Sequence, residues 1–149
     1  ILIEDGSLGK DQQSRSGAIE NNLESTARLV DAIKYTGRWT LIHNCSSEPY
    51  LDLHAKLKPS AIDYWVKAKV NPEKVKMDLE STCISTGVDG MSDTVLASPS
   101  QIESTILDSY RNYGTEGGFI ISTGGEIPLK APVENIWAIK RAAEKCRSK

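Results

Sequence analysis

The residues best suited to chemistry in this sequence are His43 and Cys45, which directly follow the apolar stretch Thr40-Leu41-Ile42. Side chains two positions apart in an extended strand point to the same face, so the imidazole and the thiol are expected side by side. A neutral imidazole and a thiolate are both good zinc ligands, which makes the pair a candidate metal site. A packed or hydrogen-bonded pair with no metal is the alternative interpretation.

Three carboxylates, Asp5, Asp89 and Glu126, also follow short apolar stretches. We consider each a candidate catalytic or substrate-contacting group. Carboxylates in this position also cap the turn that follows a strand, so a purely structural role is the alternative.

The elements that would position these side chains alternate along the chain. Short apolar runs at 1–3, 40–42, 61–65, 83–86 and 118–122 are separated by stretches with helical periodicity. The clearest helix start is the capping box Ser98-Pro99-Ser100-Gln101. This alternation is typical of parallel βαβ units, which build either an open doubly wound sheet or a closed barrel.

A barrel is the favoured architecture for two reasons. No strand-to-helix turn carries the phosphate-binding pattern G-x-G-x-x-G, and every expected strand ends in polar or Gly-rich sequence, as the mouth of a barrel requires. Trp65 and Trp137 are expected in the core, and His54 on the surface.

Composition narrows the class of protein. The 149 residues carry a net charge of −2 with acidic and basic residues interleaved, which argues against nucleic-acid binding. No apolar run approaches the roughly 20 residues that span a bilayer, and no signal peptide precedes the first strand, so a cytoplasmic protein is expected. The three cysteines are expected to be reduced thiols.

Four segments, in order, resemble the superfamily of uroporphyrinogen decarboxylases and methylcobamide:coenzyme M methyltransferases. Leu41 to Cys45 resembles its His-x-Cys-Gly strand end, with Ser46 where Gly is usual. The other matching segments are Ile62 to Trp65, Gly87 to Asp89, and the closing signature from Gly118 to Asn135. The resemblance implies a TIM-type (β/α)8 barrel in which residues 1–149 are the C-terminal part of a single domain.

The resemblance also implies an activity, a cofactor and partners. In the methyltransferases the His-x-Cys pair binds zinc together with a further Cys, and the zinc helps form a thiolate that accepts a methyl group from a methylcobamide. His43 and Cys45 match two of these ligands, but the third position falls on Gly124, with Glu126 two residues further on. The implied partners are a corrinoid protein and a small thiol such as coenzyme M.

Two alternatives stay open. One is a uroporphyrinogen decarboxylase-like enzyme, which uses neither metal nor cofactor and holds its acidic substrate with Arg and Asp. The other is a non-catalytic partial barrel that acts as a subunit or scaffold. Because a barrel of eight strands takes about 250 residues, this chain would supply about the last five. Another chain, a second copy, or residues upstream of Ile1 would then complete the barrel.

Overall fold

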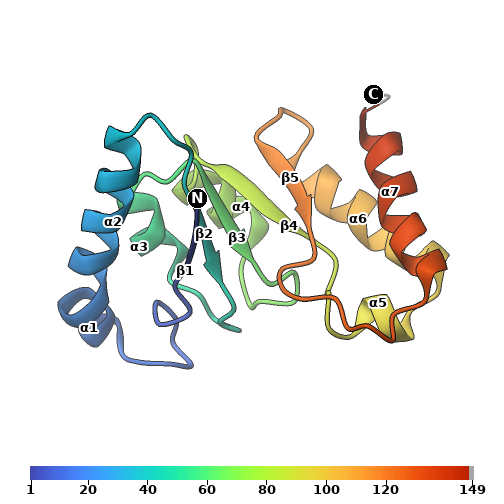
Figure 1. Ribbon diagram of the computed structural model, residues 1–149, viewed down its shortest axis with the longest axis horizontal. Helices are drawn as coiled ribbons and strands as arrows, with labels where there is room; N and C mark the ends of the chain where they lie inside the picture. The colour runs from blue at the N-terminus through green and yellow to red at the C-terminus, as the bar shows by residue number, and fades with distance from the viewer. Residues whose placement is uncertain (148–149) are drawn as a thin grey trace.

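Short strands alternate with helices along the whole computed structural model, which describes residues 1–147 (Figure 1). The strands are β1 (Leu2–Glu4), β2 (Leu41–Asn44), β3 (Ala61–Tyr64), β4 (Cys83–Gly87) and β5 (Phe119–Ser122). The helices are α1 (Arg15–Ala18), the π-helical segment η1 (Ile19–Leu23), α2 (Glu24–Tyr35), α3 (Leu51–Lys56), α4 (Pro72–Asp78), α5 (Asp93–Leu96), α6 (Pro99–Tyr113) and α7 (Val133–Arg147).

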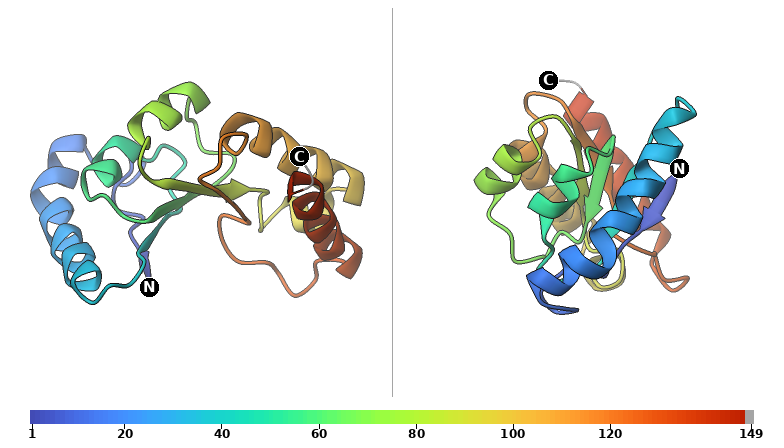
Figure 2. Two further views of the ribbon diagram at one scale, coloured as in Figure 1. Left: turned by 90° about the horizontal axis from the view of Figure 1, so that it is seen from above. Right: turned by 90° about the vertical axis from the view of Figure 1, so that its left-hand side faces the viewer.

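The five strands form one sheet in the order β1-β2-β3-β4-β5, and each strand is parallel to the next. When consecutive parallel strands lie side by side, right-handed crossovers place all the helices on the same face. Figure 2 shows the helices along the convex side of the sheet, with the other side open. A doubly wound sheet would reverse its strand order and carry helices on both faces. The fold is therefore a partial (β/α) barrel, as the sequence predicts.

The convex face of the sheet is apolar because strand residues alternate between the two faces. Ile42, Ile62 and Ile84 lie in one register row, and all three are buried. Ile62 and Ile84 pack with Leu51 of α3 and Val75 of α4. Full burial of such a side chain contributes about 1.5–3 kcal/mol, so this row anchors the helices to the sheet.

The concave face is polar in the next register row toward the carboxyl ends of the strands. Glu4, His43, Asp63 and Ser85 stand opposite one another across β1, β2, β3 and β4. In a closed barrel this face would be the interior. The chain therefore brings one charged or polar side chain from each of four strands to the same level.

The start of α6 follows its sequence signal closely. The Ser98 hydroxyl accepts from the Gln101 backbone N–H at 3.3 Å, and the Gln101 side chain accepts from the Ser98 N–H at 2.8 Å. Pro99 occupies the first turn, where its missing N–H costs nothing. The capping box is confirmed.

Three placements differ from expectation. His54 is fully buried, and its ring nitrogens lie 3.1 Å from the Tyr50 carbonyl oxygen and 3.4 Å from the Asn44 side-chain nitrogen. Burial lowers the pKa of His54. Trp137 is 53% exposed on the outer side of α7, and Trp65 lines a cavity at the end of β3. None of the helices within residues 1–147 has the length and apolar character needed to cross a membrane.

Candidate functional site

A cavity of about 940 Å³ occupies the concave face of the sheet. Its walls come from alternate residues of the strands and from the turns that follow β1, β2, β3, β4 and β5. Apolar side chains, including Leu2, Leu41 and Ile120, line one part of it. The polar row and the turns line the rest, which places the candidate chemistry at the carboxyl ends of the strands, as the barrel architecture requires.

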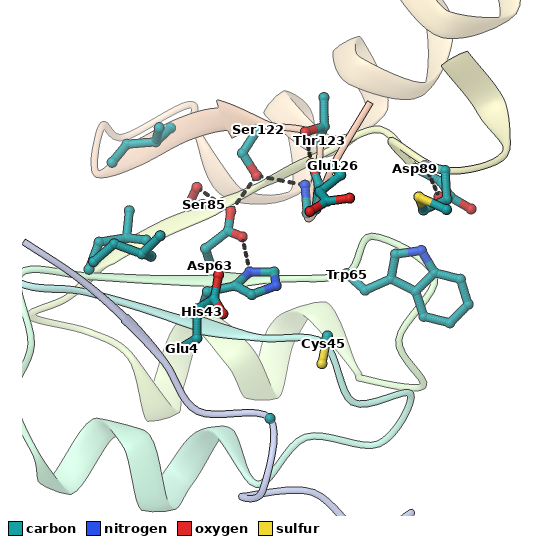
Figure 3. Close-up of a pocket in the computed structure, with 17 residues that line it drawn as sticks. Glu4, His43, Cys45, Asp63, Trp65, Ser85, Asp89, Ser122, Thr123 and Glu126 are labelled. Carbon is teal, nitrogen blue, oxygen red and sulfur yellow. Dashed lines mark hydrogen bonds and ion pairs between the residues drawn. The ribbon is translucent and has the colours of Figure 1, made fainter. Parts of the chain in front are cut away.

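His43 and Asp63 form a hydrogen-bonded pair at the centre of this polar region. His43 Nδ1 lies 2.6 Å from Asp63 Oδ2, and both side chains are largely buried (Figure 3). An ionised carboxylate can only accept, so Nδ1 carries the proton that is donated to Asp63. This fixes the imidazole tautomer and leaves Nε2 as the ring nitrogen available to a substrate or a metal.

Asp63 is held in turn by two serines from the neighbouring strands. Ser85 of β4 donates to Asp63 Oδ1 at 2.6 Å, and the Ser122 hydroxyl of β5 donates to the same oxygen. The carboxylate therefore receives donors from β2, β4 and β5. These three hydrogen bonds hold the Asp63 carboxylate in place, and the carboxylate in turn orients the His43 imidazole.

The electrostatics of the pair favour its charged form. The hydrogen bond to Asp63 raises the pKa of His43, against the opposing effect of burial. Burial by itself would raise the pKa of Asp63, but the hydrogen bonds from His43, Ser122 and Ser85 outweigh it and lower that pKa. A raised imidazole pKa makes His43 a stronger base toward a proton that arrives at Nε2.

Cys45 lines the same cavity as His43, but its thiol faces elsewhere. In Figure 3 the Cys45 sulfur points away from the His43 ring. It lies against Gly6, where an added Cβ would stand only 2.9 Å from the sulfur. The thiol is exposed and the imidazole is held by Asp63, so the two predicted zinc ligands share a cavity without converging on one point.

The position that would supply a third zinc ligand, Gly124, has a backbone conformation and close surroundings that favour glycine. Gly124 has a φ of +58°, and a Cβ there would lie 3.1 Å from the Trp65 Cα. Among residues 1–147, no group of three or more His, Cys, Asp or Glu side chains is arranged to hold a metal ion. Catalytic zinc sites use three protein ligands, so this part of the chain does not by itself form one. Zinc binding remains a prediction.

Asp89 lines the cavity, but its carboxylate already has several partners. It accepts from the backbone N–H groups of Met91 and Ser92 at 2.9 and 3.2 Å, and from Lys67 Nζ at 3.0 Å. Burial would raise the pKa of Asp89, yet the hydrogen bonds from Ser92 and Lys67 lower it to about 2. These contacts make Asp89 the cap of the turn after β4.

The other two candidate carboxylates lie in different surroundings. Asp5 is buried outside the cavity, where its two oxygens accept from Ser7 and Thr26 at 2.6 and 2.8 Å. Glu126 is exposed on the loop after β5 and lines the cavity. The structure thus brings together His43, Cys45, Asp89 and Glu126, and places Asp5 apart from them.

The residue at the centre of the site, Asp63, was not among the candidates from sequence. A signal was present, since Asp63 is the one charged residue in the strand Ala61–Tyr64. Recognising the partnership requires the register that pairs His43 with Asp63 and Asp63 with Ser85.

Comparison with known proteins agrees with this architecture. The family model of uroporphyrinogen decarboxylase (URO-D) matches residues 14–146. A solved structure of a methyltransferase from Methanosarcina mazei superposes with a TM-score of 0.77 at 15% sequence identity. The match covers 97% of this chain and 41% of that chain, and at this identity it shows a shared fold alone.

A search of the curated proteins finds no match to this sequence. The family model nevertheless extends from α1 to near the end of α7, and so includes His43, Asp63, Ser85 and Ser122. The chain belongs to the uroporphyrinogen decarboxylase family.

Proposed function

We propose that this chain supplies the proton-accepting face of a methyltransferase, in which His43 deprotonates a thiol substrate. The observation that carries this proposal is the 2.6 Å contact between His43 Nδ1 and Asp63 at the carboxyl ends of the strands. The family match and the fold shared with a methyltransferase support it. The finer assignments are a methylcobamide on a corrinoid protein as donor and a small thiol such as coenzyme M as acceptor.

The proton transfer follows from the tautomer that Asp63 imposes. Neutral His43 donates Nδ1–H to Asp63 and keeps the lone pair of Nε2, which accepts the proton of the substrate S–H group. The imidazolium is stabilised by Asp63, and sulfur keeps the electron pair of the broken S–H bond. This thiolate attacks the methyl carbon of the donor and forms the new S–C bond with its own electron pair. The bond between the methyl carbon and the donor breaks, and its electron pair stays with the donor.

Zinc would promote the same deprotonation if it were bound by His43 and Cys45. Two protein ligands are fewer than the three that catalytic zinc sites use. We therefore assign the proton transfer to His43 and treat zinc as a separate prediction.

A methyl-transfer assay with methylcobalamin and coenzyme M tests this function. Replacing His43 with Gln keeps a polar side chain but removes the base, and general base catalysis contributes about 10²–10⁴-fold to the rate. We expect a loss of that size in His43→Gln and no loss in Glu73→Gln, a control on α4 that does not line the cavity. Equal rates in His43→Gln and the unaltered protein would contradict the assignment.

The family name also favours a decarboxylase, and the charge of the cavity distinguishes the two functions. Its lining includes Glu4, Asp63, Asp89 and Glu126, with neither Lys nor Arg within the described residues. A substrate with several carboxylates would find neither Lys nor Arg to bind it in this part of the cavity. Consumption of uroporphyrinogen by the purified protein would support the decarboxylase, and its absence together with thiol methylation would support the methyltransferase.

We further infer that residues 1–149 are the C-terminal part of one barrel domain that is completed by additional strands. Within the described part of the chain, β1 and β5 each pair with one neighbour, and Leu2 is exposed on the concave face. The chain spans 41% of the Methanosarcina methyltransferase, so the partial barrel is compatible with another chain that completes it. A partial barrel without activity remains the alternative, and an absence of methyl transfer by the unaltered protein would favour it.

A further inference from the structure

Among the described residues that hydrogen-bond to Asp63, Ser122 is the one that also forms a hydrogen bond with the loop after β5. Its hydroxyl donates to Asp63 Oδ1 and accepts from the backbone N–H of Gly124 at 3.1 Å. These directions are fixed, because the carboxylate only accepts and the amide N–H only donates. A hydroxyl that accepts and donates at once is polarised along the chain of bonds, which strengthens both contacts.

The loop itself has a second attachment, on the turn after β4. The Gly90 N–H donates to the Thr123 carbonyl at 2.9 Å. A Cβ at Gly90 would lie 2.6 Å from the Glu126 carbonyl oxygen, closer than such atoms approach. The absence of a side chain at Gly90 therefore allows residues 123–126 to lie close to the turn. The position of these residues in turn places the Glu126 side chain on the cavity wall.

We propose that Ser122 is a positioning residue, which links the placement of residues 123–126 to the orientation of the His43 imidazole. The link runs from the Gly124 amide through the Ser122 hydroxyl and the Asp63 carboxylate to His43 Nδ1. The functional meaning of the link rests on the proposed role of His43 as a base. Among the hydrogen bonds of residues 1–147, those of this hydroxyl join the loop to Asp63, and a displacement of the loop should reach the base through them.

Four variants separate the link from simple loss of stability. Ser85→Ala removes the other hydroxyl donor to Asp63 Oδ1, which belongs to β4 and not to the loop. Gly90→Ala should displace the loop, because the added Cβ meets the Glu126 carbonyl oxygen, and it alters none of the four residues that form the link. Ser122→Ala removes the hydroxyl that joins Gly124 to Asp63. Ser122→Thr keeps a hydroxyl there, at a strand position that favours β-branched residues.

The decisive experiment combines Gly90→Ala with the changes at Ser122 and follows the His43 imidazole resonances by NMR. Gly90→Ala should shift these resonances when residue 122 is Ser or Thr, and should leave them unmoved when it is Ala. Hydrogen exchange at the Gly124 amide should accelerate roughly two- to tenfold in Ser122→Ala, the effect of losing one hydrogen bond, and should stay unchanged in Ser85→Ala.

The same imidazole shift on Gly90→Ala with and without the Ser122 hydroxyl would overturn the proposal, and so would the absence of any shift in the protein that keeps Ser122. Circular dichroism confirms that each variant is folded, and Ser122→Thr provides the comparison if Ser122→Ala is not. All readouts are taken on the free protein without thiol. A failure of the methyl-transfer assay therefore leaves them unaffected, and the two proposals can fail independently.

Discussion

Asp63 is a buried carboxylate whose destabilising effect on the fold is offset by its hydrogen bonds. A buried charge with no partner is strongly destabilising, but Asp63 receives hydrogen bonds from His43, Ser85 and Ser122. The same contacts set the imidazole tautomer. One group therefore serves both the stability of the partial barrel and the chemistry of the site.

The variant Asp63→Asn tests the contribution of Asp63 both to the pKa of His43 and to the stability of the fold. The amide is similar in shape but carries no charge, so the pKa of His43 should fall, and the free energy of unfolding should decrease by about 1–3 kcal/mol near neutral pH. The imidazole pKa is measured by NMR titration and the stability by urea unfolding. An unchanged pKa in Asp63→Asn would contradict the pairing.

The stability that the pair contributes should depend on pH in a defined direction. The pKa of Asp63 is lowered in the folded protein, so its contribution is lost as pH falls through that lowered value. The pKa of His43 is raised, so its contribution is lost as pH rises through that raised value. Unfolding at a series of pH values should therefore show a maximum between the two, which is flattened in Asp63→Asn.

Zinc binding is tested at Cys45. If His43 and Cys45 are ligands, the purified protein should hold about one zinc per chain, and Cys45→Ala should abolish binding. Stoichiometric zinc in that variant would exclude Cys45 as a ligand. Gly124→Cys places the missing thiolate at a positive φ, which costs about 1–2 kcal/mol, so any gain in zinc affinity should come with reduced stability of the metal-free protein.

At the scale of elements, the capping box of α6 shows which signals the sequence carries most clearly. Ser98→Ala removes the cap and should lower the free energy of unfolding by about 1 kcal/mol. Ser104→Ala on the exposed side of the same helix should be neutral or slightly stabilising, because Ala favours a helix more than Ser does. Urea unfolding of the two variants provides the comparison, and equal stabilities would mean that the cap contributes nothing.

The strands and most helices could be predicted because their signals are local, in apolar runs, helical periodicity and caps. Local patterns did not place His54 or Trp137. His54 is buried beside Asn44 of β2, and Trp137 lies on the outer side of a helix whose buried side chains include Ala138 and Ala142. Asp63 was missed for a related reason, since its importance depends on the alignment of β2, β3 and β4.

At the scale of the whole molecule, the partial barrel leaves apolar surface uncovered at its two open sides. Leu2 on β1 and Ile120 on β5 are 57% and 37% exposed, and both line the concave face. Open strand edges pair readily with other strands, and uncovered apolar patches promote association. Additional strands would cover these residues as the interior layer of a closed barrel.

We therefore expect that the isolated 149-residue chain is not a stable monomer. Light scattering should show self-association, and replacing Leu2 and Ile120 with Thr should reduce it while leaving the fold intact by circular dichroism. A well-behaved monomer of 16.3 kDa would show that the open edges are tolerated without a partner.

The central claim is that His43, oriented by Asp63, takes the proton of a thiol. The direct measurement is a titration of the protein with coenzyme M, above the pKa of free His43, in which NMR follows the imidazole and ultraviolet absorbance follows the thiolate. We predict that imidazolium and thiolate appear together in equal amounts, and that Asp63→Asn strongly reduces both. An imidazole that stays neutral while the thiol binds would contradict the role of His43 as the base.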